Sequence, residues 1–153
     1  MLNVGDLAPE FELLSDEGQP VKLSDFRGQK VILFFYPKAA TPGCTTQACG
    51  LRDNYPTIEA NGATVLGVSP DAPEALAKWR AEEGFPYLLL SDPEHEVADA
   101  YGVWGEKKMY GRAYMGIIRS HFVVGADGKL ADVQFKVSPK NSIERAVKFV
   151  EKG

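Results

Sequence analysis

Two cysteines, Cys44 and Cys49, are the side chains best suited to chemistry in this sequence. They are the only thiols among 153 residues, and both fall in the stretch TPGCTTQACG. A thiolate attacks electrophiles and binds metals, and it can be oxidised to a sulfenic acid that condenses with a second thiol. The pair therefore indicates redox, nucleophilic or metal chemistry, and its surroundings decide between these.

The first cysteine is expected at the beginning of a helix. Thr41 suits the N-cap, Pro42 suits the first helical position, and a residue before proline favours the extended backbone of a cap. Unpaired backbone N–H groups and the positive end of the helix dipole favour an anion there. We expect the pKa of Cys44 to fall from about 8.5 into the range of roughly 3.5 to 7.5 of reactive cysteines.

The second cysteine lies further along the same expected helix. At a rise of about 1.5 Å and a turn of about 100° per residue, the Cα atoms of Cys44 and Cys49 are about 8.7 Å apart and their side chains diverge by about 140°. A disulfide requires less than about 7 Å. A bond between them therefore requires local unwinding, after which Cys49 can condense with a sulfenic acid on Cys44. Alternatively, Cys49 is an inert small hydrophobe.

Metal binding is not expected. The spacing is C-x4-C, so neither the CxxC of zinc sites nor that of dithiol reductases is present, and His95 and His121 are isolated in the sequence. The sequence therefore predicts no metal and no other cofactor.

The segment before Cys44 predicts a central strand. Residues 31–36 are apolar throughout, which is typical of a strand buried on both faces of a parallel sheet, and Pro37 ends it. A helical stretch and a second strand at 64–69 complete a βαβ unit. The other expected elements are an N-terminal hairpin (10–14 and 21–23), a helix over 73–84, a strand at 87–90, a helix over 94–101, an ordered loop over 102–116, a hairpin (117–124 and 130–135) and a final helix from about 141. The whole predicts one α/β domain, 1–153, with a central mixed sheet flanked by helices.

Composition and charge disfavour several classes of protein. The net charge of −4, without a basic cluster, argues against a nucleic-acid partner. The start, MLNVGDLAPEF, lacks the pattern of a secretory signal, and no apolar run approaches the roughly 20 residues of a membrane span. We expect a cytoplasmic protein without a membrane partner, in a compartment where thiols are kept reduced and a cysteine pair is more often redox-active than structural.

The residues around the cysteines resemble a known family. Pro37, Thr41 and Cys44 match the P-x-x-x-T-x-x-C signature of the peroxiredoxins, and FYPKAATPGCTTQACGLRD is similar to the bacterioferritin comigratory protein, or Q-type, subgroup. The resemblance covers nearly the whole chain, including GDLAPEFEL near the start, YGVWGEKKMYG at 101–111 and GIIRSHFVV at 116–124.

This resemblance implies a thioredoxin-like fold and an antioxidant thiol peroxidase that reduces hydrogen peroxide and organic hydroperoxides. Cys44 would be the peroxidatic cysteine and Cys49 the resolving cysteine, joined in an intramolecular disulfide that thioredoxin or a similar dithiol donor reduces. Thr41 and Arg119 correspond to the family's other polar active-site residues. No metal, haem or flavin is implied. Nothing in the sequence marks an interface, and we expect a monomer, with a weak homodimer as the alternative.

The chemistry of these roles can be stated from the residues. Attack on a peroxide requires a thiolate and donors to the leaving oxygen, which the Thr41 hydroxyl and the backbone N–H groups of Gly43 and Cys44 can supply. Arg119 is a charge in an otherwise apolar strand, so a thiolate would be a suitable partner; alternatively, it faces water. Pro37 would close the pocket over the thiolate.

One position departs from the family pattern. His121 stands where a small hydroxyl residue is expected, and strand alternation puts it on the same face as Arg119. It is either a structural histidine or a group that makes activity depend on pH. Two other functions remain open at this point: a thioredoxin-like binding or holdase module that senses oxidant, and a general disulfide reductase, which the missing CxxC disfavours.

Overall fold

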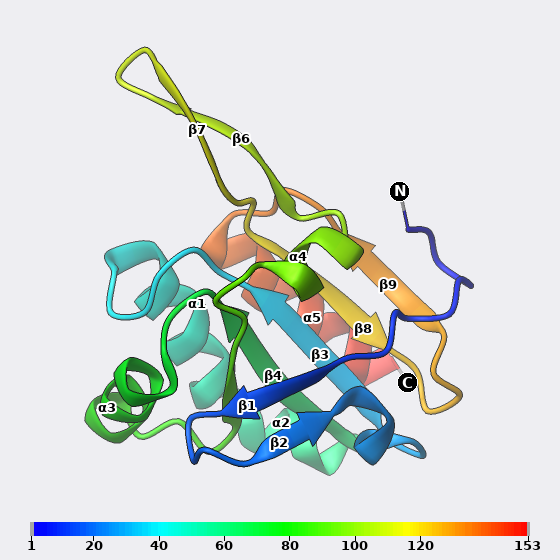
Figure 1. Cartoon of the computed structure of the whole chain (residues 1–153). Helices are drawn as coiled ribbons and strands as arrows, with labels where there is room; N and C mark the ends of the chain where they lie inside the picture. Colours follow the sequence, from blue (N-terminus) through cyan, green and yellow to red (C-terminus); the bar gives the residue numbers. More distant parts are fainter. Residues whose placement is uncertain (1, 153) are drawn as a thin grey trace.

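A mixed β-sheet runs through the centre of the molecule (Figure 1). The computed structural model describes residues 2–152; Met1 and Gly153, the ends of the expected domain, lie outside the described residues. Within the described range, seven strands pair in the order β2-β1-β5-β4-β3-β8-β9, and β6 and β7 form a separate two-stranded sheet. The strands are β1 (Glu12–Ser15), β2 (Pro20–Lys22), β3 (Lys30–Phe35), β4 (Ala63–Ser69), β5 (Leu88–Ser91), β6 (Trp104–Met109), β7 (Arg112–Ile117), β8 (Ser120–Val124) and β9 (Leu130–Gln134).

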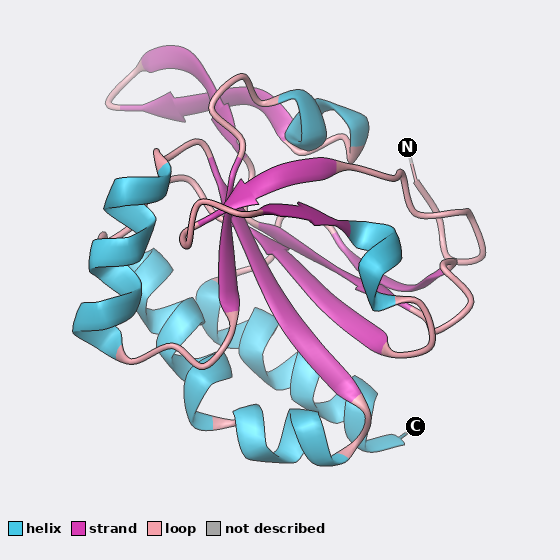
Figure 2. Cartoon of the chain, turned by 60° about the horizontal axis from the view of Figure 1, so that its bottom comes forward, coloured by secondary structure: helices cyan, strands magenta, loops and turns pink. Residues whose placement is uncertain are grey.

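Helices cover both faces of this sheet, and most lie together on one side (Figure 2). They are the 3-10 helix η1 (Leu23–Phe26) and the α-helices α1 (Pro42–Asp53), α2 (Tyr55–Ala60), α3 (Pro73–Glu83), α4 (Glu96–Ala100) and α5 (Pro139–Lys152). Buried residues of α1, α2, α3 and α5 pack against one face, whereas buried residues of α4 and η1 pack against the other. No helix of the described residues is long and apolar enough to cross a membrane.

Strand β3 is buried on both faces, as its apolar run predicts. Val31, Leu33 and Phe35 belong to one hydrophobic cluster, and Ile32 and Phe34 belong to the other. β3 pairs in parallel with β4 and antiparallel with β8. The predicted βαβ unit is therefore confirmed, with α1 and α2 between its two strands. The N-terminal hairpin is confirmed by the antiparallel pairing of β1 with β2. The chain passes from the end of β3, in the middle of the sheet, into α1.

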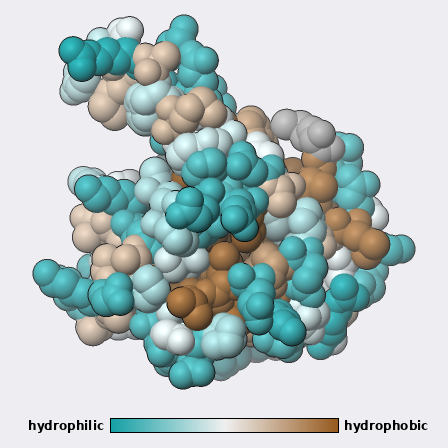
Figure 3. Space-filling view, viewed as in Figure 1, coloured by the Kyte–Doolittle hydropathy of each residue, from teal (hydrophilic) through white to brown (hydrophobic). Residues whose placement is uncertain are grey.

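The segment 102–116 is not the ordered loop that the sequence analysis expects. β6 and β7 form an antiparallel ribbon that stands clear of the body, with hydrophilic and hydrophobic side chains mixed along it (Figures 1 and 3). The two strands are joined by Tyr110 and Gly111, both with positive φ, 52° and 77°. Such a turn normally has Asn-Gly or Asp-Gly, and an exposed ribbon shows no alternation of buried residues, so the usual hairpin signals are absent.

Three further boundaries differ from expectation. The expected strand 117–124 is divided, because Ile117 ends β7 and Ser120 begins β8. The expected helix over 94–101 is the shorter α4, and the final helix begins at Pro139 rather than near residue 141. Ends of elements depend on local hydrogen bonds that sequence patterns do not specify. The first difference matters most, because it places Arg119 in the connection between ribbon and sheet.

Candidate active site

Cys44 lies in the first turn of α1 with its side chain fully buried. The helix begins at Pro42, and Thr41 has the extended N-cap backbone that the sequence predicts. The first helical hydrogen bond is donated by the Thr45 N–H to the Thr41 carbonyl, over 2.8 Å. The N–H groups of Gly43 and Cys44 precede it, so helix geometry leaves them to an acceptor at the end of the helix.

The loop between β3 and α1 is anchored by Asp71. Its carboxylate oxygen Oδ2 accepts hydrogen bonds from the Ala39 N–H, over 2.8 Å, and from the Ser69 hydroxyl, over 2.7 Å. Pro37, half-buried, begins this loop directly after the buried Tyr36. The carboxylate therefore ties the segment that carries Pro37 to the end of β4, and the position of Cys44 depends on that tie.

Thr41 contributes its hydroxyl to the loop rather than to the helix. The hydroxyl donates to the Lys38 carbonyl over 2.7 Å, in place of the side-chain capping bond typical of an N-cap threonine. Between these residues, Ala40 has a positive φ of 64°, a conformation that is costly for a side chain with Cβ. In this geometry the Thr41 oxygen keeps its lone pairs as acceptors while its proton holds the loop.

Arg119 contacts Cys44, although the two residues are 75 positions apart in the sequence. The guanidinium nitrogen Nη2 lies 3.4 Å from Cys44 Sγ, and Nη1 donates to Gln47 Oε1 over 2.7 Å. Arg119 is half-buried and lies between β7 and β8, not inside a strand. Its planar fork thus spans two side chains of one helix turn and places a permanent positive charge against the Cys44 sulfur.

Gly43 leaves space for that guanidinium. A Cβ atom at this position would lie 3.1 Å from Arg119 Nη2, the nitrogen that contacts the thiol, and 3.7 Å from Pro139 Cγ. This approach is closer than side chains ordinarily tolerate. The expected role of Gly43 lies in its backbone N–H; in the structure, a residue with a side chain at this position would also press on Arg119.

Gln47 is a site residue that the sequence analysis missed. Its side chain is fully buried, and its amide nitrogen donates to Ser142 Oγ of α5 over 2.9 Å while its oxygen accepts from Arg119. The signal was present, because Gln47 follows Cys44 by three residues and therefore shares its helix face. Ser142 carried no such signal.

His121 is fully buried and lies next to Ser142. Its Nδ1 is 2.7 Å from Ser142 Oγ, and its Nε2 is 3.8 Å from Asp132 Oδ2, beyond hydrogen-bond distance. Strand alternation does not apply to Arg119, which lies outside β8, but the two residues are connected through Ser142 and Gln47.

Cys49 is partly exposed, and α1 runs without a break from Cys44 past it. Both cysteines are free thiols. Burial raises the pKa of the Cys49 thiol, and the carboxylate of Glu83, whose Oε1 is 3.8 Å from Sγ, raises it further against the opposing effect of Arg52. Cys49 is therefore a weaker acid than an ordinary cysteine.

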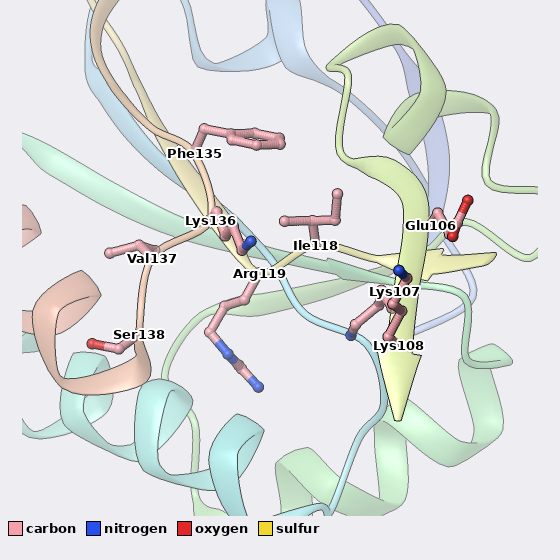
Figure 4. A pocket seen from close by; sticks show the side chains of 9 residues that line it. All are labelled: Glu106, Lys107, Lys108, Ile118, Arg119, Phe135, Lys136, Val137 and Ser138. Carbon is pink, nitrogen blue, oxygen red and sulfur yellow. The ribbon is translucent and has the colours of Figure 1, made fainter. Parts of the chain in front are cut away.

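A cavity of about 690 Å³ opens beside Arg119. Figure 4 shows Glu106, Lys107 and Lys108 of β6 on one side of it, residues 135–138 on the other, and Ile118 and Arg119 between them. Burial lowers the pKa of Lys107, and the charge of Arg119 lowers it further, although Cys44 acts in the opposite direction. The lining of the cavity combines the apolar side chains of Ile118, Phe135 and Val137 with an excess of positive charge.

The described residues contain no group of three or more His, Cys, Asp or Glu side chains that could hold a metal ion. The polar groups collected around Cys44 are instead a cation, an amide and backbone N–H groups. Groups of this kind can donate hydrogen bonds to a negatively charged sulfur or oxygen atom.

Comparison with known protein families agrees with this geometry. A family model described as the AhpC/TSA family matches residues 4–133. Peroxiredoxin Bcp of Escherichia coli is 48% identical over 144 residues, covering 93% of this chain and 92% of that protein. Peroxiredoxin Bcp of Bacillus subtilis is 43% identical over 150 residues, covering 98% of this chain and 96% of that protein.

Solved structures show the same fold. A cysteine-to-serine mutant of Xylella fastidiosa PrxQ superposes with a TM-score of 0.93 at 30% identity, covering 99% of this chain and 97% of that one. A structure of Xanthomonas campestris Peroxiredoxin Q gives a TM-score of 0.87 at 30% identity, with coverage of 93% and 90%. The thioredoxin-like fold expected from the resemblance is confirmed.

Proposed function

Because the chain belongs to the bacterioferritin comigratory protein group of the peroxiredoxins, which are thiol peroxidases, we propose that Cys44 attacks the peroxide and that Cys49 resolves the product. The observation that carries this assignment is the contact of 3.4 Å between Arg119 Nη2 and Cys44 Sγ. A buried thiol at a helix beginning, next to a permanent cation, has the surroundings that favour a thiolate.

In the first step, the Cys44 thiolate attacks one oxygen of the peroxide, and the O–O bond breaks. The thiol sulfur is oxidised by two electrons to a sulfenic acid, and the other oxygen leaves as hydroxide or alkoxide, which takes a proton to become water or an alcohol. The N–H groups of Gly43 and Cys44 and the guanidinium of Arg119 stabilise the oxygens as negative charge moves onto the leaving atom. Pro37 and the rest of the loop between β3 and α1 shield the thiolate from bulk water.

In the second step, the Cys49 thiol attacks the sulfenic sulfur, forms the disulfide and releases water. The two residues lie on an unbroken helix, so the first turns of α1 must unwind before the sulfurs meet. An external dithiol, thioredoxin or a similar donor, then reduces the disulfide and is itself oxidised. Since both thiols come from one helix, we propose that a monomer, folded as one domain, completes the cycle.

Organic hydroperoxides are proposed as substrates beside hydrogen peroxide. The cavity of about 690 Å³ next to Arg119 is large enough for an organic substituent, and Ile118, Phe135 and Val137 supply apolar surface. Recycling needs a reducing environment, so the cytoplasm is the proposed location.

The experiment mixes fully reduced protein with a sub-stoichiometric pulse of hydrogen peroxide and follows peroxide, free thiols and mass. The expected result is rapid loss of two thiols per peroxide, with a monomer-mass product two hydrogens lighter. Cys44→Ser is expected to react no faster than a free thiol, and Cys49→Ser is expected to consume one equivalent and stop at the sulfenic acid. Normal dithiol-dependent turnover by Cys44→Ser would refute the assignment.

A further inference from the structure

A chain of hydrogen-bonded side chains leads from the Cys44 thiol into the interior of the protein. Arg119, which contacts Cys44 Sγ, donates to Gln47 Oε1 over 2.7 Å; Gln47 Nε2 donates to Ser142 Oγ over 2.9 Å; and Ser142 Oγ lies 2.7 Å from His121 Nδ1. Gln47, Ser142 and His121 are all fully buried. These side chains come from α1, α5 and β8, so the chain joins three elements behind the thiol.

The first hydrogen bonds in the chain have a fixed direction. A guanidinium can only donate, so the Gln47 oxygen must face Arg119 and its NH₂ group must face Ser142. Ser142 therefore accepts from Gln47 and has one proton of its own to give. Its other side-chain partner among the described residues is His121 Nδ1, which accepts that proton only when this nitrogen carries no hydrogen. The neutral imidazole with its hydrogen on Nε2 is the form that gives every donor of the chain up to His121 Nδ1 an acceptor.

The other ring nitrogen faces a carboxylate. Nε2 of His121 has no hydrogen-bond partner among the described residues and lies 3.8 Å from Asp132 Oδ2. Burial of Asp132 by itself would raise its pKa, but the facing His121 ring and the Gln134 amide favour the carboxylate, so the pKa is lowered overall. A negative charge thus stands at the end of the chain that begins at the cationic Arg119.

We propose that neutral His121 is a positioning residue that holds Arg119 against Cys44, and that protonation of His121 weakens this hold. A protonated ring donates from both nitrogens, so Nδ1 no longer accepts the Ser142 proton. The Ser142 oxygen has two lone pairs and can accept from both Gln47 and the ring, but its own proton then has no partner in the chain. Ser142 is no longer held as a donor to His121, and the support that reaches Arg119 through Gln47 is weakened.

Charges of both signs belong to this network. Asp132 on β9 faces Nε2 of His121, and Arg119, before β8, stands at the opposite end of the hydrogen-bond chain. From α5, Arg145 donates to Gln134 Oε1, and Gln134 in turn donates to Asp132, so this cation draws on the same carboxylate. On the remaining sides, α1 contributes the neutral Gln47, and β3 contributes Phe34, the strand neighbour of His121.

This inference rests on the proposed function, because its effect is measured in the rate at which peroxide oxidises Cys44. A histidine that only fills space would leave that reaction unchanged as long as the fold is intact. A histidine that holds Arg119 changes both the rate of thiol oxidation and its dependence on pH.

Two substitutions at His121 separate these roles. His121→Asn offers an amide oxygen near the place of Nδ1, an acceptor that cannot be protonated. His121→Leu removes the acceptor, so Ser142 loses its partner and Arg119 its support. The rate of Cys44 oxidation by hydrogen peroxide is measured from acidic to neutral pH, with the melting temperature of each variant. The control is His95→Asn, because His95 is the other histidine, is partly exposed and takes no part in the hydrogen-bond chain.

For His121→Leu we expect a rate constant on the order of 10- to 100-fold lower at neutral pH, as for a catalytic group displaced by about 1 Å. For His121→Asn we expect a smaller decline toward acidic pH than in the unmodified protein, and for His95→Asn no change. Ser142→Ala should reproduce the loss seen with leucine while keeping His121 in place. Should the leucine variant fail to fold, the asparagine and Ser142→Ala variants still decide the question.

A second measurement does not depend on peroxidase activity. In His95→Asn, His121 is the only histidine, so NMR of histidine-labelled protein reports its tautomer directly. The expected form at neutral pH carries its hydrogen on Nε2; hydrogen on Nδ1 would overturn the proposal, as would unchanged pH dependence in His121→Asn. If the unmodified protein reacts no faster than a free thiol, the proposed function fails instead, and the tautomer still tests the hydrogen-bond chain.

Discussion

Gly43 and Arg119 approach each other so closely that a Cβ atom at Gly43 would lie 3.1 Å from Nη2 of the arginine. This is the nitrogen that contacts Cys44. Gly43→Ala should therefore displace the guanidinium and slow oxidation of Cys44 by roughly 10- to 100-fold. Alanine also stabilises a helix relative to glycine by roughly 0.5 to 1 kcal/mol, so the melting temperature should not fall.

Stopped-flow kinetics measures the rate of Cys44 oxidation in Gly43→Ala, and thermal unfolding of the same sample measures its melting temperature. The rate should fall while the melting temperature does not. Thr46→Ala is the matched control, because Thr46 lies exposed in the same part of α1. It should leave the rate unchanged. Equal rates for Gly43→Ala and the unmodified protein would mean that the guanidinium position is unimportant.

Arg119→Lys is expected to be far from conservative. The guanidinium contacts Cys44 and Gln47 with different nitrogens, and a single ammonium group cannot reproduce that fork. We expect kcat/KM for hydrogen peroxide to fall by about 100-fold or more, as on removal of one donor to developing charge. Arg112→Lys, on the exposed ribbon, serves as the control. A loss below about threefold in Arg119→Lys would show that charge alone is sufficient.

Asp71→Ala should loosen the loop that precedes the active cysteine. The carboxylate accepts from the Ala39 N–H and the Ser69 hydroxyl, and removing it leaves both donors without this partner. We expect a loss of about 1 to 3 kcal/mol in the free energy of unfolding, measured with urea. The reaction of Cys44 with peroxide should slow as well, because the loop between β3 and α1 loses its hydrogen bond to the Asp71 carboxylate.

The control for this change is Glu59→Ala, an exposed acidic residue on α2. It removes the same charge without touching the loop and should alter neither quantity. A destabilised Asp71→Ala variant with an unchanged rate of Cys44 oxidation would indicate that the loop supports the fold but not the site.

Glu83→Gln should make Cys49 more reactive. Burial raises the pKa of this thiol, and the Glu83 carboxylate raises it further, so removing the charge lowers the pKa and increases the thiolate fraction at any pH below it. In a Cys44→Ser background, we expect alkylation of Cys49 by iodoacetamide to accelerate several-fold near neutral pH, with the profile displaced toward lower pH.

Glu82→Gln, at the exposed neighbouring position, should leave alkylation unchanged. Arg52→Gln should act in the opposite direction and slow it, because the arginine lowers the pKa of Cys49. Equal acceleration by both glutamate substitutions would assign the effect to overall charge rather than to the contact with Glu83.

Several features of the site could be predicted from local sequence. A buried strand, a proline that ends it and a Thr-Pro pair suffice to place Cys44 in the first turn of a helix, because strand burial, capping and proline geometry act over a few residues. The spacing of the two cysteines likewise determines that they cannot bond within an intact helix. The βαβ unit and the N-terminal hairpin follow from similar short-range patterns.

The ribbon of β6 and β7 could not be predicted in this way. Its strands bury little, and its turn uses Tyr110 at a positive φ, so neither periodicity nor turn composition marked it. The same ribbon moves Arg119 out of a strand and into a connection, and it supplies Lys107 to the cavity. Whether β6 pairs with β7 depends on where the chain leaves the central sheet after β5 and where it returns to it at β8, which is a property of the tertiary structure.

By itself, the sequence determined which thiol lies at the helix beginning and that its partner is out of reach, since neighbouring residues control helix geometry. Only the tertiary structure decided what stands next to that thiol. Arg119, Ser142 and His121 are distant from Cys44 along the chain. Arg119 contacts Cys44, and Ser142 and His121 join the same hydrogen-bond chain, because β8 pairs with β3 while α5 packs on α1. No local pattern specifies such meetings, because they result from burying the faces of separate elements against one another.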